Sequence, residues 1–246
     1  PLQQIRFDDG TTWSLDTLVA KVFDGTAGSD TIYGTPTADV LNGQAGADIL
    51  YGRAGDDTLM GGADSDQLIG EEGADALYGE TGDDYLIGGA GADTLDAGDG
   101  ADYLSGDMGN DSLLGGTGDD YLDGGADADT LIGGVGNDQL YGGAGNNIYL
   151  FGKGDGQDAV SYNYDTTVGK LNTLQLKPGV LPSELLLKQV SSPNFWNGAS
   201  LEISIAGTTD KITFNGVFVN NDPTSAYNPL QQIRFDDGTT WSLDTL

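Results

Sequence analysis

The chain contains no cysteine and no histidine, and its 246 residues include 9 basic and 39 acidic side chains. The lack of cysteine excludes disulfides, thiolate metal sites and thiol nucleophiles, and the lack of histidine removes the usual partner of a serine nucleophile. No apolar run is long enough to cross a bilayer, so we expect no transmembrane segment. A net charge of −30 has the wrong sign for nucleic acid or an anionic membrane surface. A small cation is the partner that this composition favours.

What the chain has instead is a repeat. Residues 25–150 are fourteen consecutive copies of one glycine-rich nine-residue pattern, without insertion. Asp occupies position six of the first thirteen copies, and Ile, Leu or Tyr occupies position eight of all fourteen. This periodicity is typical of a parallel β-helix that binds calcium. The segment holds 25 acidic residues and one basic residue, Arg53, so we expect it to fold only when a cation neutralises it.

Two nonapeptides make one coil, so alternate copies stack, with strands about 4.8 Å apart. The position-six residues then form two columns of candidate metal ligands. One column holds Asp30, Asp48, Asp66, Asp84, Asp102, Asp120 and Asp138, and the other holds Asp39, Asp57, Asp75, Asp93, Asp111, Asp129 and Asn147. Stacked carboxylates repel unless a divalent ion lies between them, and a set of carboxylate and carbonyl oxygens suits Ca²⁺.

Glycines at positions one and four are candidates for turning carbonyl oxygens toward the ions, because glycine adopts left-handed backbone angles. They include Gly43, Gly46, Gly52, Gly55, Gly88, Gly91, Gly115, Gly118, Gly133 and Gly136. We expect positions one to six of each copy to form the turn and positions seven to nine to form a short strand.

Departures from the pattern predict weaker sites in copies two, five, twelve and fourteen. Copy two contains Pro36 and Thr37, copies five and twelve place Asp64 and Asp127 at a glycine position, and copy fourteen ends the column with Asn147. After a two-residue slip, residues 154–160 resemble a further turn, which makes Asp158 a candidate last ligand. We therefore expect about ten bound Ca²⁺ ions. The alternative is that these aspartates are solvated turn formers.

Position eight is predicted to point inward as the core, and positions seven and nine outward. One outer face then carries a row of tyrosines: Tyr33, Tyr51, Tyr85, Tyr103, Tyr121 and Tyr141. Such a row either stabilises the sheet by ladder packing or forms a binding face, because aromatic side chains with polar tips favour interfaces.

A second repeat concerns the ends of the chain, because residues 1–18 recur unchanged as residues 229–246. The spacing indicates a repeating unit, so the chain is interpreted as part of a larger tandem-repeat protein with neighbouring units as partners. Three parts are expected: residues 1–24, a hairpin and lead-in that ends the preceding unit; residues 25–150, the roll; and residues 151–246, a β-rich cap ending in the duplicated hairpin. Residues 172–176, 201–205 and 211–214 are predicted to be antiparallel strands of this cap. Trp196 in the cap is a candidate exposed aromatic.

The array resembles the RTX (repeats-in-toxin) family, also called haemolysin-type calcium-binding repeats, and the segments Tyr149 to Asp158 and Ile233 to Trp241 are similar to the cap-like segment that often follows such rolls. The resemblance implies an all-β fold: a right-handed parallel β-roll followed by a small antiparallel β cap. It also implies bacterial type I secretion and folding in external calcium, hence a secreted or cell-surface location.

We therefore expect the chain to be a calcium-binding module that folds on Ca²⁺ binding and acts as a structural or extender unit of a large secreted or cell-surface protein. The alternative is a carbohydrate- or protein-binding module, with a glycan or surface protein on the tyrosine face or the cap. We expect no enzymatic activity. Carboxylate pairs are abundant, but they are better explained as metal ligands.

Overall fold

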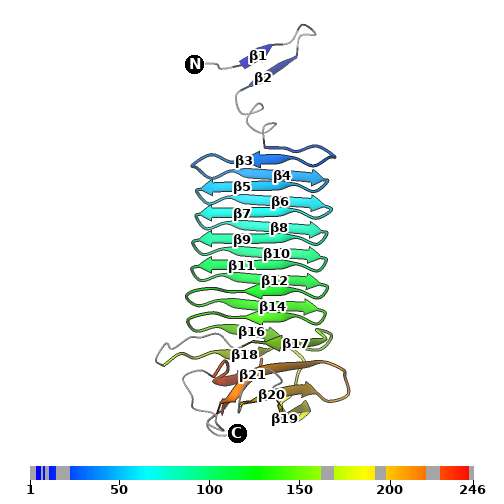
Figure 1. Ribbon diagram of the computed structural model, residues 1–246, viewed down its shortest axis with the longest axis vertical. Coiled ribbons are helices and arrows are strands. Elements are labelled where there is room, and N and C mark those ends of the chain that lie inside the picture. The colour runs from blue at the N-terminus through cyan, green and yellow to red at the C-terminus, as the bar shows by residue number, and fades with distance from the viewer. Residues whose placement is uncertain are drawn as a thin grey trace.

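The computed structural model describes residues 4–6, 8, 11–14, 23–161, 169–191, 198–219 and 228–243. These residues form a parallel β-solenoid of stacked coils, followed by antiparallel strands near the C-terminus (Figure 1). The one helical element in the described ranges is a short 3₁₀ turn, η1 (Pro182–Glu184). The predicted fold class is confirmed.

Two long sheets run the length of the solenoid, because alternate nonapeptides stack on each other. In spatial order the first sheet contains β19 (Leu185–Ser191), β20 (Gly198–Ile205), β21 (Lys211–Val219), β17 (Gln157–Val160), β15 (Gln139–Tyr141), β13 (Tyr121–Asp123), β11 (Tyr103–Met108), β9 (Tyr85–Ala90), β7 (Gln67–Glu72), β5 (Ile49–Ala54) and β3 (Thr31–Tyr33). The second contains β23 (Thr240–Ser242), β22 (Gln232–Arg234), β18 (Thr173–Leu176), β16 (Ile148–Phe151), β14 (Thr130–Val135), β12 (Ser112–Thr117), β10 (Thr94–Asp99), β8 (Ala76–Thr81), β6 (Thr58–Ala63) and β4 (Val40–Ala45).

The strands of the roll are longer than the predicted three residues. Most of them span six, covering positions seven to nine and then positions one to three of the next copy, as in β8 and β9. The prediction that positions one to six form the turn is therefore wrong. The strand bends where position two takes a left-handed φ, such as 77° at Gln44, and then continues pairing with the neighbouring coil, so only positions four to six form the turn.

The core between the sheets is one apolar side chain wide. Position eight points inward, as predicted: Leu50, Leu86 and Leu122 are completely buried, and the row begins with Ile32 and ends with Tyr149. Each leucine packs between the leucines of the coils before and after it, because coils pair in register (Leu68 with Leu86, for example). A core this narrow contributes little hydrophobic burial per residue, so other interactions must support the stack.

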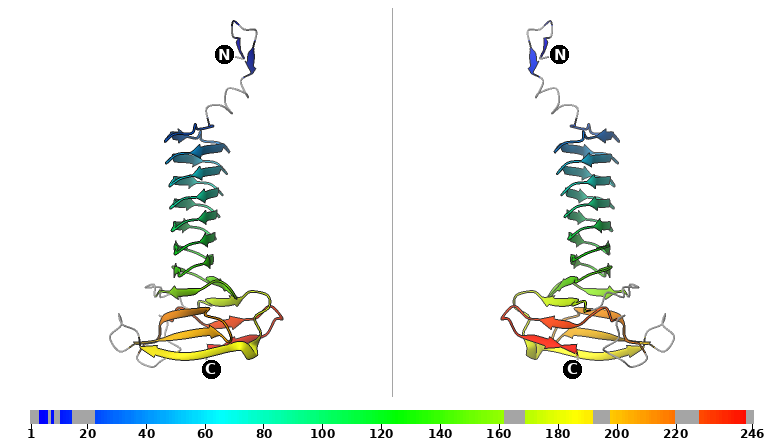
Figure 2. Two further views of the ribbon diagram at one scale, coloured as in Figure 1. Left: turned by 90° about the vertical axis from the view of Figure 1, so that its right-hand side faces the viewer. Right: turned by 90° about the vertical axis from the view of Figure 1, so that its left-hand side faces the viewer.

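Beyond residue 150 the solenoid continues before the fold changes. β16 pairs in parallel with β14, and β18 pairs in parallel with β16. The prediction that residues 172–176 form an antiparallel cap strand is therefore wrong, because this segment stacks in register on the roll. β20 is antiparallel to both β19 and β21, so the antiparallel part begins there. The side views in Figure 2 show the narrow roll widening at these strands. Trp196 lies outside the described residues.

Candidate metal sites

Two columns of position-six side chains run along the roll, held in place by one repeated hydrogen bond. The backbone N–H of each residue donates to Oδ1 of the position-six side chain one coil further on. Asp48 N donates to Asp66 Oδ1 at 2.7 Å, and Asp75 N donates to Asp93 Oδ1 at 2.8 Å. The columns that the 18-residue coil predicts are thus present. From Asp48 onward, each carboxylate uses one oxygen to link two coils.

The other oxygen of these carboxylates is buried and has no hydrogen-bond partner. This holds for Oδ2 of Asp48, Asp57, Asp66, Asp75, Asp84, Asp93, Asp102, Asp111, Asp120, Asp129 and Asp138. Each of these residues is at most 3% exposed. A buried carboxylate oxygen without a partner is costly, so eleven of them in two columns favour an additional ligand.

The glycine at position one makes room for this oxygen. A Cβ added to Gly70 would collide with Oδ2 of Asp75 and with the carbonyl oxygen of Gly88 in the next coil, and the same holds for Gly43 with Asp48 and Gly61. The carboxylate oxygen and a backbone carbonyl oxygen therefore point into one small space. Two oxygens that converge in a buried space repel each other unless a cation lies with them.

Among the candidate glycines, position four needs glycine both for its φ and for space, because an added Cβ would also collide with the neighbouring coil, whereas position one needs it for space alone. At position four, Gly46, Gly55, Gly91 and Gly118 have φ between 101° and 148°, as expected. At position one, Gly43, Gly52, Gly88, Gly115 and Gly133 have no left-handed φ, and glycine is needed there for space. Gly136 differs from the other position-four glycines because it has no left-handed φ, so glycine is needed there only for space beside the carbonyl of Gly118.

Copy nine has Ala97 at position one, where the other copies have glycine. Ala97 is completely buried, and its copy supplies Asp102. Copy nine therefore has a methyl group at position one, where the glycines of the other copies leave room for the carboxylate oxygen. Sequence reasoning missed this position, although the substitution itself is visible in the repeat. Asp64 and Asp127, by contrast, take the left-handed φ of the glycines that they replace, at 77° and 80°.

In the first coil, threonines donate hydrogen bonds to the position-six aspartates. Asp30 Oδ2 accepts hydrogen bonds from Thr26 N and Thr26 Oγ1 at 2.6 and 2.8 Å, and Asp39 Oδ2 accepts from Thr35 N and Thr35 Oγ1 at 2.6 and 2.7 Å. The second oxygen of both aspartates is thus already in use. The sequence singled out copy two for its Pro36 and Thr37, whereas the hydrogen bonds come from Thr35.

At the other end, both columns continue past the nonapeptides. Asp138 N donates to Asp158 Oδ1 at 3.2 Å, which places Asp158 at the end of its column. Asp129 N donates to Asn147 Oδ1 at 2.9 Å, and Asn147 N donates to Asn172 Oδ1 at 2.8 Å. Asn172 belongs to no nonapeptide and was missed. Its signal in the sequence is only an amide side chain directly before an alternating apolar strand.

Burial raises the pKa of most column carboxylates. Desolvation is the main cause, and it raises the pKa of Asp66 to about 7 and that of Asp111 to about 7, although a backbone N–H donated to each lowers it. Neighbouring aspartates of the same column raise it further. At the end of the column, burial and Asp138 raise the pKa of Asp158 to about 8. In the absence of a cation, these carboxyls hold protons well above their usual range.

The donor set fits a hard cation. In the ranges that the structure describes, no three Asp or Glu side chains gather around one point, so any ion must take backbone carbonyls as well. Carboxylate and carbonyl oxygens without nitrogen or sulfur are the ligands that Ca²⁺ accepts in flexible geometry. The unpartnered Oδ2 atoms supply the carboxylate oxygens, and the backbone carbonyls beside the position-one glycines supply the others.

The outer face of the first sheet carries the six tyrosines. Tyr85, Tyr103 and Tyr121 stack on one another with ring centroids 4.7 and 5.0 Å apart, and Tyr141 follows Tyr121 at 4.8 Å. Tyr33 and Tyr51 form a separate stacked pair at 4.9 Å. The exposed fraction is 52% at Tyr33 and 40% at Tyr85. The six side chains are thus brought together as two ladders.

Comparison with known proteins agrees with this geometry. The family described as RTX calcium-binding nonapeptide repeat (4 copies) matches residues 24–59, 51–86, 78–113, 105–140, 114–149 and 123–158, which together cover more than half of the chain. The chain belongs to the RTX calcium-binding repeat family. It is a calcium-binding RTX module whose repeats form a β-roll. The haemolysin-type calcium binding protein related domain matches residues 201–245, the strands that follow the roll.

One curated relative is the iron-regulated protein FrpA of Neisseria meningitidis serogroup C. It is 44% identical over 98 residues, which are 40% of this chain and 8% of the relative. The chain therefore spans a small part of that protein's length. Across the described residues of the RTX module, no helix is both long and apolar enough to cross a membrane.

Proposed function

We propose that the RTX module binds Ca²⁺ through the eleven aspartates from Asp48 to Asp138 that have an unpartnered Oδ2. The observation that supports this assignment is their shared geometry: Oδ1 accepts from the coil before, while Oδ2 is buried beside a backbone carbonyl. The number of ions is then close to the expected ten, with the Asp102 site weakened by Ala97. Asp30, Asp39, Asn147 and Asp158 would cap the columns rather than hold a full site.

Ca²⁺ binding would also drive folding of the roll. The apolar core is one side chain wide, and the buried carboxylates oppose folding as long as they are charged. Since the sites exist only in the folded coil, the free energy of binding stabilises the fold. We infer that the chain is unfolded after synthesis in low calcium and folds once it reaches external calcium after type I secretion.

The test combines structure and stoichiometry. Circular dichroism of the metal-stripped chain during a Ca²⁺ titration should show β-structure appearing with the metal. Native mass spectrometry should then count about ten ions per chain. Complete β-structure in metal-stripped protein at neutral pH would contradict calcium-driven folding. A count of two or three ions would contradict the assignment of the columns.

In a larger protein, such a module serves as a structural or extender unit rather than as a catalyst. The roll is a stack of nearly identical coils, and its two sheets continue without a break into the strands beyond residue 150. The recurrence of residues 1–18 as residues 229–246 supports a tandem arrangement with neighbouring units. The location would be secreted or on the cell surface.

The tyrosine face supports a second candidate, in which the module binds a glycan or a surface protein. The exposed edges of Tyr33 and Tyr85 favour an interface. Against a glycan, the rings of Tyr85, Tyr103 and Tyr121 cover one another's faces, which are the surfaces on which sugars stack. The Tyr103→Ser substitution separates the two hypotheses. If the tyrosines form a binding face, the variant should lose association with the partner. If they only form a ladder, the variant should lose thermal stability and nothing else.

A further inference from the structure

The two copies of the duplicated segment form the same hairpin. In the N-terminal copy β1 (Gln4–Arg6) pairs with β2 (Thr12–Ser14), and Ile5 lies opposite Trp13. In the C-terminal copy β22 pairs with β23, and Ile233 lies opposite Trp241. The register is identical when 228 is added to each number. Whatever surface recognises one hairpin therefore meets the same chemical groups on the other.

The C-terminal copy is docked on the edge of β18. β22 pairs with β18 in parallel, with Leu174 opposite Ile233. Leu230, Ile233 and Phe235 are at most 2% exposed, so the hairpin supplies part of the core at this end of the solenoid. Without it, β18 would present an open sheet edge and an uncovered apolar surface.

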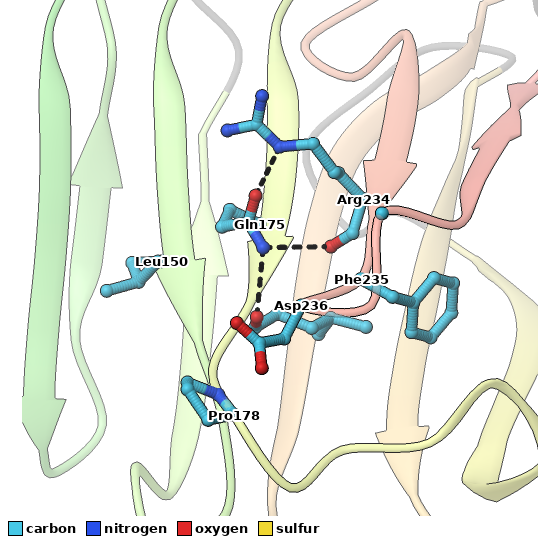
Figure 3. A pocket seen from close by; sticks show the side chains of 8 residues that line it. Leu150, Gln175, Pro178, Arg234, Phe235 and Asp236 are labelled. Atoms are coloured by element: carbon cyan, nitrogen blue, oxygen red, sulfur yellow. Dashed lines mark hydrogen bonds between the residues drawn. The ribbon is translucent and has the colours of Figure 1, made fainter.

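Side chains make the docking specific. Asn172 N donates to Gln231 Oε1 at 2.6 Å, and Gln232 Nε2 donates to Thr173 Oγ1 at 2.7 Å. Figure 3 shows Gln175 at the centre of the contact: its Nε2 donates to the carbonyl of Arg234 at 3.3 Å, and its Oε1 accepts from Arg234 Nε. The corresponding residues of the N-terminal copy are Gln3, Gln4 and Arg6.

In the described residues, the N-terminal copy lies on no other strand. Within the described part of the chain, β1 and β2 pair only with each other and form a separate two-stranded sheet (Figure 1). An isolated two-stranded hairpin is marginally stable in water, because it has no layer on which to bury its apolar side chains. The chain thus holds two copies of the same docking element, and the C-terminal copy is the one that lies on the edge of β18.

We propose that the edge of β18 accepts this hairpin from a second copy of the chain as well as from its own C-terminus. Docking in trans replaces β22–β23 of one molecule by β1–β2 of another and joins them head to tail. Because the two segments are identical, the hairpin of a neighbour can form the same hydrogen bonds and bury the same side chains as the chain's own. The chain's own hairpin is favoured at low concentration through its high effective concentration. This inference does not depend on which residues bind calcium.

The experiment uses the full chain in Ca²⁺ with one matched substitution in each hairpin. Ile233→Asp places a charge in the buried contact with β18 and should release the chain's own hairpin, leaving the edge open. The N-terminal hairpin of a neighbour then docks, and the weight-average mass should at least double across roughly a hundredfold rise in concentration. Analytical ultracentrifugation measures this mass.

The controls place the same aspartate in the N-terminal hairpin, alone or together with Ile233→Asp. Ile5→Asp alone should remain monomeric at low concentration and unfold at the wild-type temperature. The double variant Ile5→Asp/Ile233→Asp should lose the association of Ile233→Asp, since both docking elements are then disabled. A monomeric Ile233→Asp at every concentration would overturn the proposal. Equal association of the single and double variants would also overturn it, because it would show adhesion that does not involve the hairpin.

Discussion

The two carboxylate oxygens of Asp66 differ in their contacts, because only one of them accepts a hydrogen bond from Asp48. Oδ1 accepts a hydrogen bond from the backbone N–H of Asp48 at 2.7 Å, whereas Oδ2 is buried without a partner. The same division recurs along both columns. It separates a structural role, the link between coils, from the capacity to hold a cation, and it allows the two to be changed independently.

The Asp84→Asn substitution tests this division. Asparagine keeps an oxygen that can accept from Asp66 N but replaces the buried Oδ2 by an amide nitrogen, which repels a cation. We expect the chain to bind one Ca²⁺ fewer and to need more calcium to fold, as measured by native mass spectrometry and a titration followed by circular dichroism. Asp83→Asn is the matched control, because Asp83 is exposed and loses the same charge. An equal loss in both variants would point to net charge rather than to a site.

The acidity of the columns predicts an unusual dependence on pH. The buried Asp102 and Asp129 have pKa values raised to about 7 from an ordinary 3.8, with desolvation as the main cause. The folded state without metal therefore binds protons more tightly than the unfolded chain. Its stability is greatest below about pH 4 and is lost as the pH rises through 7. Metal-stripped protein should gain β-structure on acidification.

With calcium the dependence reverses. The ion competes with the protons for the same carboxylates, so the concentration of Ca²⁺ needed for folding should fall as the pH rises from about 5 to 8. Circular dichroism of the metal-stripped and the calcium-bound chain from about pH 5 to 8 checks both directions of the pH dependence. A metal-stripped chain that gains no β-structure on acidification would show that the columns do not hold protons in the folded state.

The space at position one predicts opposite effects for two substitutions. Gly79→Ala places a methyl group against Asp84 Oδ2 and the carbonyl of Ala97, so we expect a loss of about 1–3 kcal/mol in the free energy of unfolding. Ala97→Gly opens the site of Asp102 and should raise the affinity of its ion. Thermal unfolding at fixed calcium measures both. Gly28→Ala is the control, because its Cβ would meet nothing within 4 Å.

Backbone strain at position two gives a further prediction. Glu71 has a φ of 77°, which is unfavourable for any residue with a Cβ, whereas its neighbour Glu72 is not among the left-handed residues. Glu71→Gly should therefore stabilise the roll by about 1 kcal/mol. Glu72→Gly removes the same charge and should destabilise it by about 0.5–1 kcal/mol. If thermal unfolding at fixed calcium shifts equally in both variants, charge and not φ is responsible.

The sequence alone determined the features that follow from a strict period. A repeat of nine with one apolar residue places Leu86 and its equivalents in a single inward row, and an 18-residue coil aligns Asp48, Asp66 and Asp84. These relationships need only the geometry of a stacked strand, so the repeat was enough to predict them. The composition then indicated a cation, since nothing else in the repeat balances the carboxylates.

The tertiary structure decided which atoms meet, both within a coil and across coils. Thr35 takes the second oxygen of Asp39, Asn172 extends a column from outside the repeats, and β18 joins the roll in parallel instead of beginning the antiparallel strands. The crowding of an added Cβ at the position-one and position-four glycines is also visible only in the structure. Most of these are contacts between segments one coil or more apart in the chain, and local sequence does not specify how those segments approach each other.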